Sequence, residues 1–504
     1  MKSSAFLIST IVFVVLAQDA RALELREIDV RGVTLPLKAD FGRSIEGYQG
    51  ELITAKLLDQ VKGAIFQAYS DAGYFARVTF PEQDLTNGVL RIDVQELTLG
   101  NVTVRADDSV RLDAARAEKY LTRVISKESP LSINDLDRQS IALDSLNGVA
   151  AEQSLSFPDD TRQVDVEIKL EATEFSEFSA QVDNFGTKGT GRERVSIDAQ
   201  YNSLLGFGDR MVFSAVKSHG LFSRSADLEL PAGYGGKRLV YGYNSSKFKT
   251  TGDNSVHGKS MRDYVRFRSG DTFVFRSPLN LEFGIERSRT SDSTNESKRN
   301  TEKYAAASLA WVNSASSAAA NVSARLIFGD LRSYRTPTPA DLALNAIGSY
   351  KKLLLNVTGQ KKLSSQNSFT VTSACQFSSK NLDSMSEIEL SGPSAVRAYD
   401  VAAVSVDQGC FAQMEFLHQR NEQRAFFGFL DAGWGQTHHS TYPNWQEAQE
   451  SNVFSIFGAG VGARLDISDK FNVSITYAKR LGTCSGCAQP QAQDRLSAVL
   501  KVTF

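Results

Sequence analysis

Cysteine and histidine, from which many catalytic and metal sites are built, are scarce in this chain, with four Cys and five His among 504 residues. His438 and His439 are adjacent in a polar stretch, where a solvated pair is a simpler interpretation than a metal site. Cys484 and Cys487 could close a small ring or bind a metal ion, but a single CxxC pair is a weak signal. The sequence therefore predicts no enzyme activity, no cofactor and no metal site.

A strong charge imbalance and a long internal apolar run are also missing. The formal net charge is -2 and the pI is about 6.3, whereas nucleic-acid-binding proteins are usually strongly basic. Beyond the amino terminus, no stretch approaches the ~18 apolar residues of a membrane-spanning helix. The mean hydropathy of -0.25 does not exclude a membrane barrel, because its alternating strands dilute hydropathy. Glycine-rich stretches at 206–208 and 458–462 do not precede a helix, so a phosphate-binding loop is not expected.

Residues 1–22 have the pattern of a secretory signal peptide. Lys2 precedes an apolar run from Ala5 to Ala17, and Ala20-Arg21-Ala22 supplies a small-x-small cleavage site. An uncleaved anchor helix is the alternative, but the apolar run is shorter than a membrane span requires. We expect cleavage after Ala22 and export of the mature chain.

Residues 25–172 contain a diverged internal repeat. Each copy combines a strand, helical periodicity and two further strands, with Gly73 or Gly148 placed after the last helix, where a left-handed cap is wanted. We expect two β-α-α-β-β modules of about 75 residues each, a size that can fold alone. The predicted modules span 23–97 and 98–172.

Helical periodicity disappears after residue 173, and segments of about ten residues alternate apolar with polar side chains. This length fits tilted membrane strands of ~9–11 residues. An even number of strands places both ends of a barrel wall on the periplasmic side. The sixteen predicted strands of this 173–504 region are 174–185, 192–202, 209–218, 223–231, 237–248, 259–270, 278–290, 302–313, 318–330, 349–358, 366–378, 402–418, 424–436, 452–466, 470–480 and 493–504.

The connections between these strands are tight on one side, as at 203–208 and 314–317, and long and polar on the other, as at 331–348 and 379–401. Short periplasmic turns and long external loops are typical of outer-membrane barrels. A soluble β-sandwich or propeller is the alternative, and it does not predict this asymmetry. Cys375 and Cys410 fall on neighbouring predicted strands; a disulfide and free thiols both remain open.

The last strand has one apolar and one polar face and ends in an aromatic residue. This is the expected end of an outer-membrane barrel, which is apolar toward lipid and polar toward its lumen. Side chains on a strand alternate between faces. The apolar face carries Leu496, Ala498, Leu500, Val502 and Phe504, and the other carries Arg495, Ser497, Val499, Lys501 and Thr503.

The longest predicted loop contains Val396-Arg397-Ala398-Tyr399, and Asp431 lies on the lumen-facing side of the 424–436 strand. With these residues the chain resembles the two-partner secretion transporters, the TpsB class, which export haemolysins and filamentous adhesins. Val396-Arg397-Ala398-Tyr399 matches the VRGY-type loop tip of that family, and Asp431 matches its wall carboxylate. The turn Leu204-Leu205-Gly206-Phe207-Gly208-Asp209 resembles the family's periplasmic turn, in which Gly206, Gly208 and Asp209 stand out.

The resemblance implies a β-barrel membrane protein of the cell outer membrane: a 16-stranded antiparallel barrel preceded by two periplasmic POTRA modules. It implies a long loop folded into the lumen and held there by an Arg397–Asp431 contact. Its partners would be one large secreted exoprotein (a TpsA-type haemolysin or adhesin), outer-membrane lipid and the barrel assembly machinery that inserts it, with no nucleic acid.

The chain departs from the family pattern at Ala398, where Gly is usual, and it leaves no room for the amino-terminal plug helix of some members. Two alternative functions remain open at this stage. An outer-membrane protein assembly factor of the same superfamily shares the Arg–Asp contact but usually carries more POTRA modules. A passive porin-like channel needs no periplasmic docking modules.

Overall fold

The computed structural model describes residues 23–36, 42, 45–252, 255–270, 272–274, 277–294, 297–337, 339–442, 451–484 and 492–504. The predicted signal peptide, residues 1–22, and Cys487 lie outside these ranges. Among the described helices, none is both long and apolar enough to cross a membrane.

The first repeat folds as a three-stranded sheet with a helix against it. The sheet order is β1-β3-β2, with β1 parallel to β3 and β2 antiparallel to it. The helix begins after Thr54, whose side chain accepts from the backbone N–H of Leu57, and Gly73 follows it with φ +80°. Its apolar stripe is buried against the sheet. These elements are β1 (Glu27–Arg31), α2 (Ala55–Asp71), β2 (Ala76–Thr79) and β3 (Val89–Glu96).

The second repeat has the same plan, with sheet order β4-β6-β5 and two helices. Ser132 caps the second of these helices, because its hydroxyl accepts from the backbone N–H of Asp135 at 3.2 Å. Gly148 follows with φ +82°. The elements are β4 (Thr98–Ala106), α3 (Ala114–Thr122), α4 (Ile133–Asp144), β5 (Val149–Ser156) and β6 (Gln163–Ala172).

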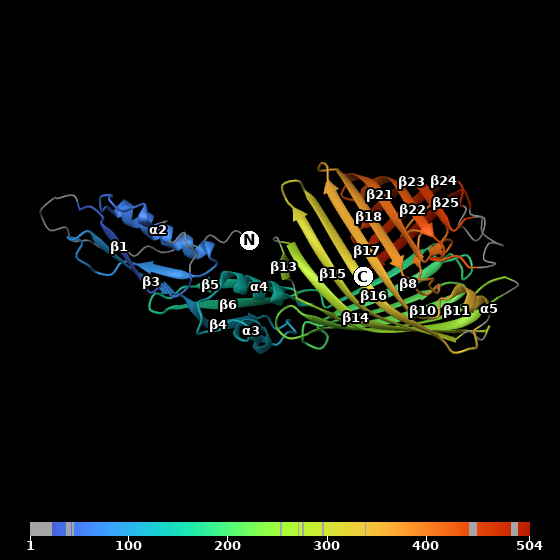
Figure 1. Ribbon diagram of the computed structural model, residues 1–504, viewed down its shortest axis with the longest axis horizontal. Helices are drawn as coiled ribbons and strands as arrows, with labels where there is room; N and C mark the ends of the chain where they lie inside the picture. The colour runs from blue at the N-terminus through green and yellow to red at the C-terminus, as the bar shows by residue number, and fades with distance from the viewer. Residues whose placement is uncertain are drawn as a thin grey trace. The chain divides into compact units, whose positions relative to one another are not determined.

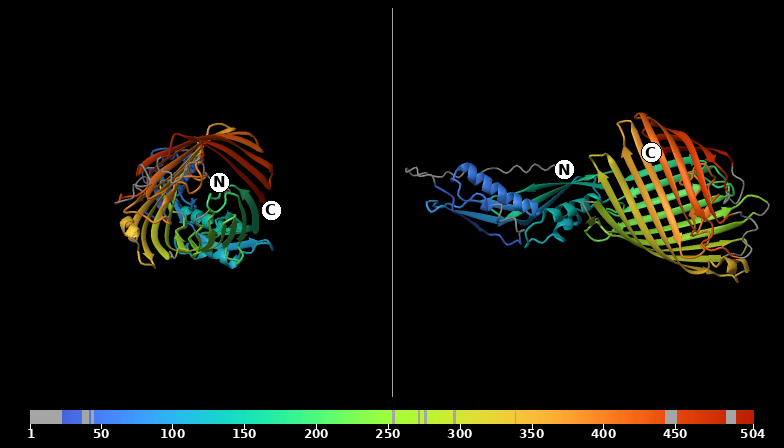
Figure 2. Two further views of the ribbon diagram at one scale, coloured as in Figure 1. Left: turned by 90° about the vertical axis from the view of Figure 1, so that its right-hand side faces the viewer. Right: turned by 45° about the horizontal axis from the view of Figure 1, so that its top comes forward.

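The remaining chain forms a closed antiparallel barrel of sixteen long strands within the described residues (Figure 1). Figure 2 shows them as one curved wall of tilted strands, and β25 pairs with β7 to close it. A short strand, β13 (Thr272–Val274), and a helix, α5 (Pro339–Leu344), lie in connections. The long strands are β7 (Ser176–Asp183), β8 (Arg194–Asn202), β9 (Arg210–Lys217), β10 (Leu221–Pro231), β11 (Arg238–Lys249), β12 (His257–Arg268), β14 (Ser277–Asp292), β15 (Ser297–Asn313), β16 (Ala318–Ser333), β17 (Gly348–Lys362), β18 (Asn367–Ser378), β21 (Gln408–Asn421), β22 (Arg424–Gln436), β23 (Val453–Ser468), β24 (Phe471–Leu481) and β25 (Asp494–Thr503).

The two faces of the wall differ as the alternation predicts. Many outward side chains are large, apolar and exposed, among them Ile197, Val461 and Leu496. Inward side chains include networks of ions: Glu282, for example, lies 2.9 Å from Arg268 and 3.3 Å from Arg325. A barrel with an apolar exterior and a polar lumen is suited to a membrane.

The predicted strands agree with the observed ones to within a few residues, with one larger difference. The strand predicted at 402–418 begins at Gln408, because residues 405–406 form a separate short strand, β20, which pairs with β19 (Ile388–Glu389). Cys375 and Cys410 lie directly opposite each other on β18 and β21 and form a disulfide.

Candidate functional site

The connection between β18 and β21, residues 379–407, is folded into the lumen rather than exposed outside the barrel. We call it the lumen loop. Its core is buried against lumen-facing side chains of β22–β24. The buried loop residues in this core are Leu390, Val396, Ala398, Tyr399, Val404 and Val406.

Arg397, at the tip of the lumen loop, is paired with Asp431 on β22. The guanidinium donates from Nε to Oδ2 at 2.9 Å and from Nη2 to Oδ1 at 2.8 Å, and the backbone N–H of Arg397 donates to Oδ2 at 3.0 Å. The Asp431 side chain is fully buried and that of Arg397 is 13% exposed. A bidentate Arg–carboxylate pair of this kind combines charge with fixed geometry.

Two further groups hold the same guanidinium. Its Nη1 donates to Glu415 on β21 at 2.8 Å, and its Cζ lies 3.6 Å from the centroid of the Phe429 ring. Glu415 also accepts from Arg464 on β23 at 2.6 Å. Arg397 is therefore held by β21 and β22 at once, with a cation–π contact beneath it.

Glycines on the inner wall let the loop tip approach closely. A Cβ added at Gly458 on β23 would lie 2.8 Å from the Cβ of Ala398, and one added at Gly433 on β22 would lie 3.2 Å from a methyl group of Val396. Ala398 is not among the described residues with positive φ. Alanine, at the position where the resemblance implies glycine, is therefore accommodated without backbone strain.

The close approach predicts a compensating pair. Gly458→Ala should displace the loop tip, because its new Cβ overlaps Ala398. Ala398→Gly in the same chain should restore docking, since it removes the atom that clashes. Protease cleavage of the loop measures docking, with Gly359→Ala on β17, where the added Cβ meets nothing within 4 Å, as the control. A Gly458→Ala chain that stays fully docked would contradict the contact.

The base of the lumen loop is held by other strands, β15 and β17, than the β21–β22 pair that binds Arg397. Lys298 of β15 lies 2.7 Å from Asp383, and Asn300 of β15 donates to the hydroxyl of Ser386 at 2.9 Å. Lys352 of β17 donates to the backbone oxygen of Ser386 at 3.2 Å. Near the loop tip, Arg495 of β25 donates to the backbone oxygen of Tyr399 at 2.5 Å, and β15 and β25 are eight positions apart in the ring of sixteen long strands. A loop held near both walls crosses the lumen.

Lys352 also forms an ion pair with Glu302 of β15, at a distance of 2.9 Å. Glu302 also accepts from the hydroxyl of Tyr350 at 2.6 Å. The side chains of Lys352 and Glu302 are 8% and 13% exposed. The pair lies within the wall and meets the lumen loop at Ser386, whose backbone oxygen accepts from Lys352. We call this contact the second anchor of the lumen loop.

Asp400, directly after the loop tip, binds cations from both sides of the seam that closes the barrel. Lys188 and Arg192, which lie between β7 and β8, approach it to 2.9 Å each, and Arg495 of β25 lies 3.5 Å away. The seam itself pairs only Ser179–Asp183 with Val499–Thr503. Burial raises the pKa of Asp400, but the three cations outweigh it and hold that pKa below its ordinary value.

Carboxylates are also crowded in the base of the lumen loop. Burial, together with Asp407, Asp383 and Glu389, raises the pKa of Glu387 from 4.5 to about 8. Burial raises the pKa of Asp407 to about 6, although the backbone N–H groups of His439 and Leu382 oppose the shift. In the docked loop, Glu387 therefore holds a proton at neutral pH.

These shifts predict that docking of the lumen loop weakens as pH rises. A released Glu387 loses its proton near pH 4.5, whereas the docked one keeps it to about pH 8. Docking is thus most favourable below pH 4.5 and falls progressively until about pH 8. Protease cleavage of the loop should increase between pH 5 and pH 8.5, and Glu387→Gln should flatten most of the increase. Glu422→Gln, in an exposed turn, is the control; an unchanged slope in Glu387→Gln would contradict the assignment.

The turn at 203–209 is built around Asp209. Its fully buried carboxylate accepts from the backbone N–H of Leu205 at 3.1 Å and of Phe207 at 3.2 Å. Gly206 and Gly208 have φ of +78° and +74°, which side-chain-bearing residues rarely adopt. The backbone N–H of Asn147 donates to the oxygen of Gly208 at 3.3 Å. The turn thus has a fixed shape.

Within the described ranges, no group of three His, Cys, Asp or Glu side chains is arranged to hold a metal ion. The charged groups of the lumen loop and its walls are instead paired with each other, an arrangement that can hold and release a loop.

Comparison with known families agrees with this geometry. The family model for haemolysin secretion/activation protein ShlB/FhaC/HecB matches residues 163–465, more than half of the chain. This chain belongs to the haemolysin secretion/activation family. A model of the ShlB-type POTRA domain also matches residues 23–96. Members of the family are outer-membrane transporters of two-partner secretion, with POTRA domains in the periplasm, and the expected fold class and location are confirmed.

Individual relatives are distant. The heme/hemopexin transporter protein HuxB of Haemophilus influenzae is 22% identical over 87% of this chain and 80% of its own length. The outer membrane transporter CdiB of Dickeya dadantii is 25% identical over 49% of this chain and 46% of its own length.

Two solved structures share the fold. CdiB from Escherichia coli superposes with a TM-score of 0.78 at 18% identity, covering 98% of this chain and 93% of that one. BamA from Haemophilus ducreyi, solved without POTRA domains 1–3, gives a TM-score of 0.54 at 13% identity, covering 95% of this chain and all of that one. The likeness to a barrel assembly protein extends only to the fold.

The sequence singled out Arg397 and Asp431, and the structure places them in contact. It did not single out Glu415, Asp400 or Lys352. The sequence contains a weak indication of Glu415. It is a carboxylate on the lumen face of the strand next to β22, and a side chain there is within reach of the same Arg. Asp400 follows the tip motif directly, but its partners lie more than 90 residues away and no spacing reveals them.

Proposed function

We propose that this family member recognises one large secreted protein of the TpsA type, a haemolysin or adhesin, in the periplasm and exports it, unfolded, through its barrel to the cell surface. The observation that carries this proposal is the lumen loop, which ion pairs join to β15, β22 and β25. A loop that crosses the lumen must shift before a chain can pass.

The modules at 23–97 and 98–172 would receive the client. Their sheets end in β1 and β2, and in β4 and β5, whose outer edges can pair with an extended chain. Such strand addition recognises backbone more than side chains and suits an unfolded client. The protein is proposed not to be an enzyme.

Movement of the client would be coupled to release of Arg397 from Asp431 and Glu415. No nucleotide-binding motif is present in the sequence, so folding of the client outside the cell is the proposed driving force. The protein itself would depend on the barrel assembly machinery for insertion and on outer-membrane lipid for its surroundings.

Deletion of the gene tests this function. The secreted partner should accumulate in the periplasm while the levels of other outer-membrane proteins stay unchanged. A general loss of outer-membrane proteins would instead support an assembly factor. This alternative shares its fold with BamA, so the fold alone does not decide between the two functions. Normal secretion of every large exoprotein after deletion, together with unchanged levels of other outer-membrane proteins, would contradict both.

A further inference from the structure

The lipid-facing wall of β9–β12 carries a row of positive charge near its external end. β7 follows the second module directly and begins at the periplasmic end, so β10 begins at the external end. Phe222, the second residue of β10, lies between Lys217 of β9 and Lys247 of β11. Lys247 is in turn opposite Lys259 of β12.

These lysines point outward. Side chains directly opposite each other on paired strands share a face. Phe222 is 46% exposed, and Val195, which lies opposite Lys217 on β8, is 48% exposed. Arg224, two residues further along β10, lies on the same face between Ala215 and Ser245. We call Lys217, Arg224, Lys247 and Lys259 the basic row.

The basic row is not neutralised by the protein. Among the described residues, no carboxylate lies at ion-pair distance from any of its four members. A cation on the lipid face is unfavourable at the bilayer centre, and the penalty fades toward the headgroups. Cations placed together near the headgroups of one leaflet are suited to an anionic ligand there.

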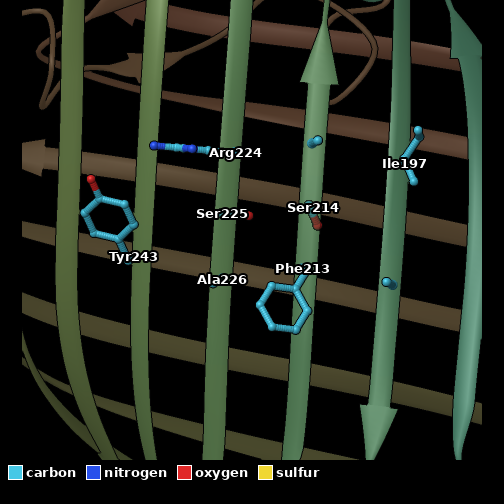
Figure 3. A pocket seen from close by; sticks show the side chains of 9 residues that line it. Ile197, Phe213, Ser214, Arg224, Ser225, Ala226 and Tyr243 are labelled. Carbon is cyan, nitrogen blue, oxygen red and sulfur yellow. The ribbon is translucent and has the colours of Figure 1, made fainter.

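An apolar groove begins beside Arg224. Figure 3 shows Arg224 reaching over the neighbouring strand on the side of Tyr243, with Phe213 and Ile197 on the adjoining strands. Ala226 lies between Phe213 and Tyr243, and Ala215 lies between Ile197 and Arg224. The small alanines leave space between the larger side chains. The groove volume of about 440 Å³ lies within the roughly 300–1,000 Å³ of single-ligand sites.

We propose that this face binds a phosphorylated glycolipid of the outer leaflet. Its phosphate would meet Arg224 and the lysines of the basic row, and an acyl chain would lie in the groove over Ala215 and Ala226. The charge of the row selects the phosphate, and its place near the external strand ends selects the outer leaflet. At the external ends of β22 and β23 the lipid face instead carries Trp434 and Val453.

Native mass spectrometry of the detergent-solubilised full chain tests the site, with diphosphoryl lipid A, dephosphorylated lipid A and phosphatidylglycerol as separate probes. We expect saturable binding of diphosphoryl lipid A that falls at least tenfold in Lys217→Gln/Arg224→Gln/Lys247→Gln. Ala226→Phe, which fills the groove while keeping the charges, should reduce binding several-fold. The control Lys479→Gln removes an exposed cation of β24 that lies opposite Ala459 and Asp494 and should bind as the original chain does.

The change in gel mobility on heating shows whether each variant folds, and single Arg224→Gln replaces the triple variant if that chain does not fold. Equal binding of the original and charge-depleted chains would overturn the proposal. Equal loss in Lys479→Gln would overturn it too, since any surface cation would then serve. Equally tight binding of phosphatidylglycerol would overturn the assignment to the outer-leaflet glycolipid.

Discussion

Arg397→Ala should increase the ion conductance of the reconstituted barrel and impair export of the client, without preventing insertion of the barrel. The substitution leaves Asp431 buried without its cation and Glu415 with Arg464 alone. Losing one partner of a buried ion pair costs about 3–5 kcal/mol, which corresponds to a change of roughly two to four orders of magnitude in the docking equilibrium. Single-channel recording in planar bilayers measures the effect.

Asp431→Ala should have the same effect, and the double variant should be no worse than either single variant. The two residues act through one contact, so their effects overlap rather than add. Arg424→Ala, which removes an exposed cation at the periplasmic end of the same strand, provides the control. Fully additive losses for Arg397→Ala and Asp431→Ala would show that the two side chains do not work together.

Lys352→Met should release the base of the lumen loop, because it leaves Glu302 buried without its cation and removes the donor to Ser386. The expected cost is again about 3–5 kcal/mol. The double variant Glu302→Gln/Lys352→Met should release the loop less than Lys352→Met does, since it leaves no unpaired charge in the wall. Cleavage of the loop by an added protease, followed by mass spectrometry of the fragments, measures release. Lys351→Met, at the exposed neighbouring position, should leave cleavage unchanged.

The two anchors are held by different strands, so Arg397→Ala and Lys352→Met should combine additively. A combined effect equal to that of Arg397→Ala alone would mean that the base anchor does not hold the loop. If Lys352→Met and Glu302→Gln/Lys352→Met increase cleavage of the loop equally, the unpaired charge of Glu302 is not the cause of its release.

Much of the barrel is predictable from sequence because period-two alternation is local. Leu496 and Leu500 face outward and Arg495 faces inward, as the pattern of the last strand predicts. The error at 402–418 has a physical cause. Val404 and Val406 alternate with polar neighbours as in a wall strand, but they are buried in the core of the lumen loop instead.

The site was predictable only in part. The Arg397–Asp431 contact followed from the resemblance to a family rather than from spacing, since 34 residues separate the two. Closure of the barrel determines the other contacts: it places Arg495 of β25 beside the β7–β8 connection, so that both can bind Asp400. A linear pattern does not contain such pairings.

Tethering the loop tip tests the central claim most directly. A Cβ added at Gly458 would lie 3.4 Å from Cγ1 of Val396, so Val396→Cys/Gly458→Cys, in the Ala398→Gly background, can link the loop to the wall. Export should stop in the oxidised variant and resume after mild reduction, while the Ala398→Gly chain without the added cysteines exports under both conditions. Continued export with the tether closed, verified by mass spectrometry, would contradict passage of the client through a lumen that this loop must vacate.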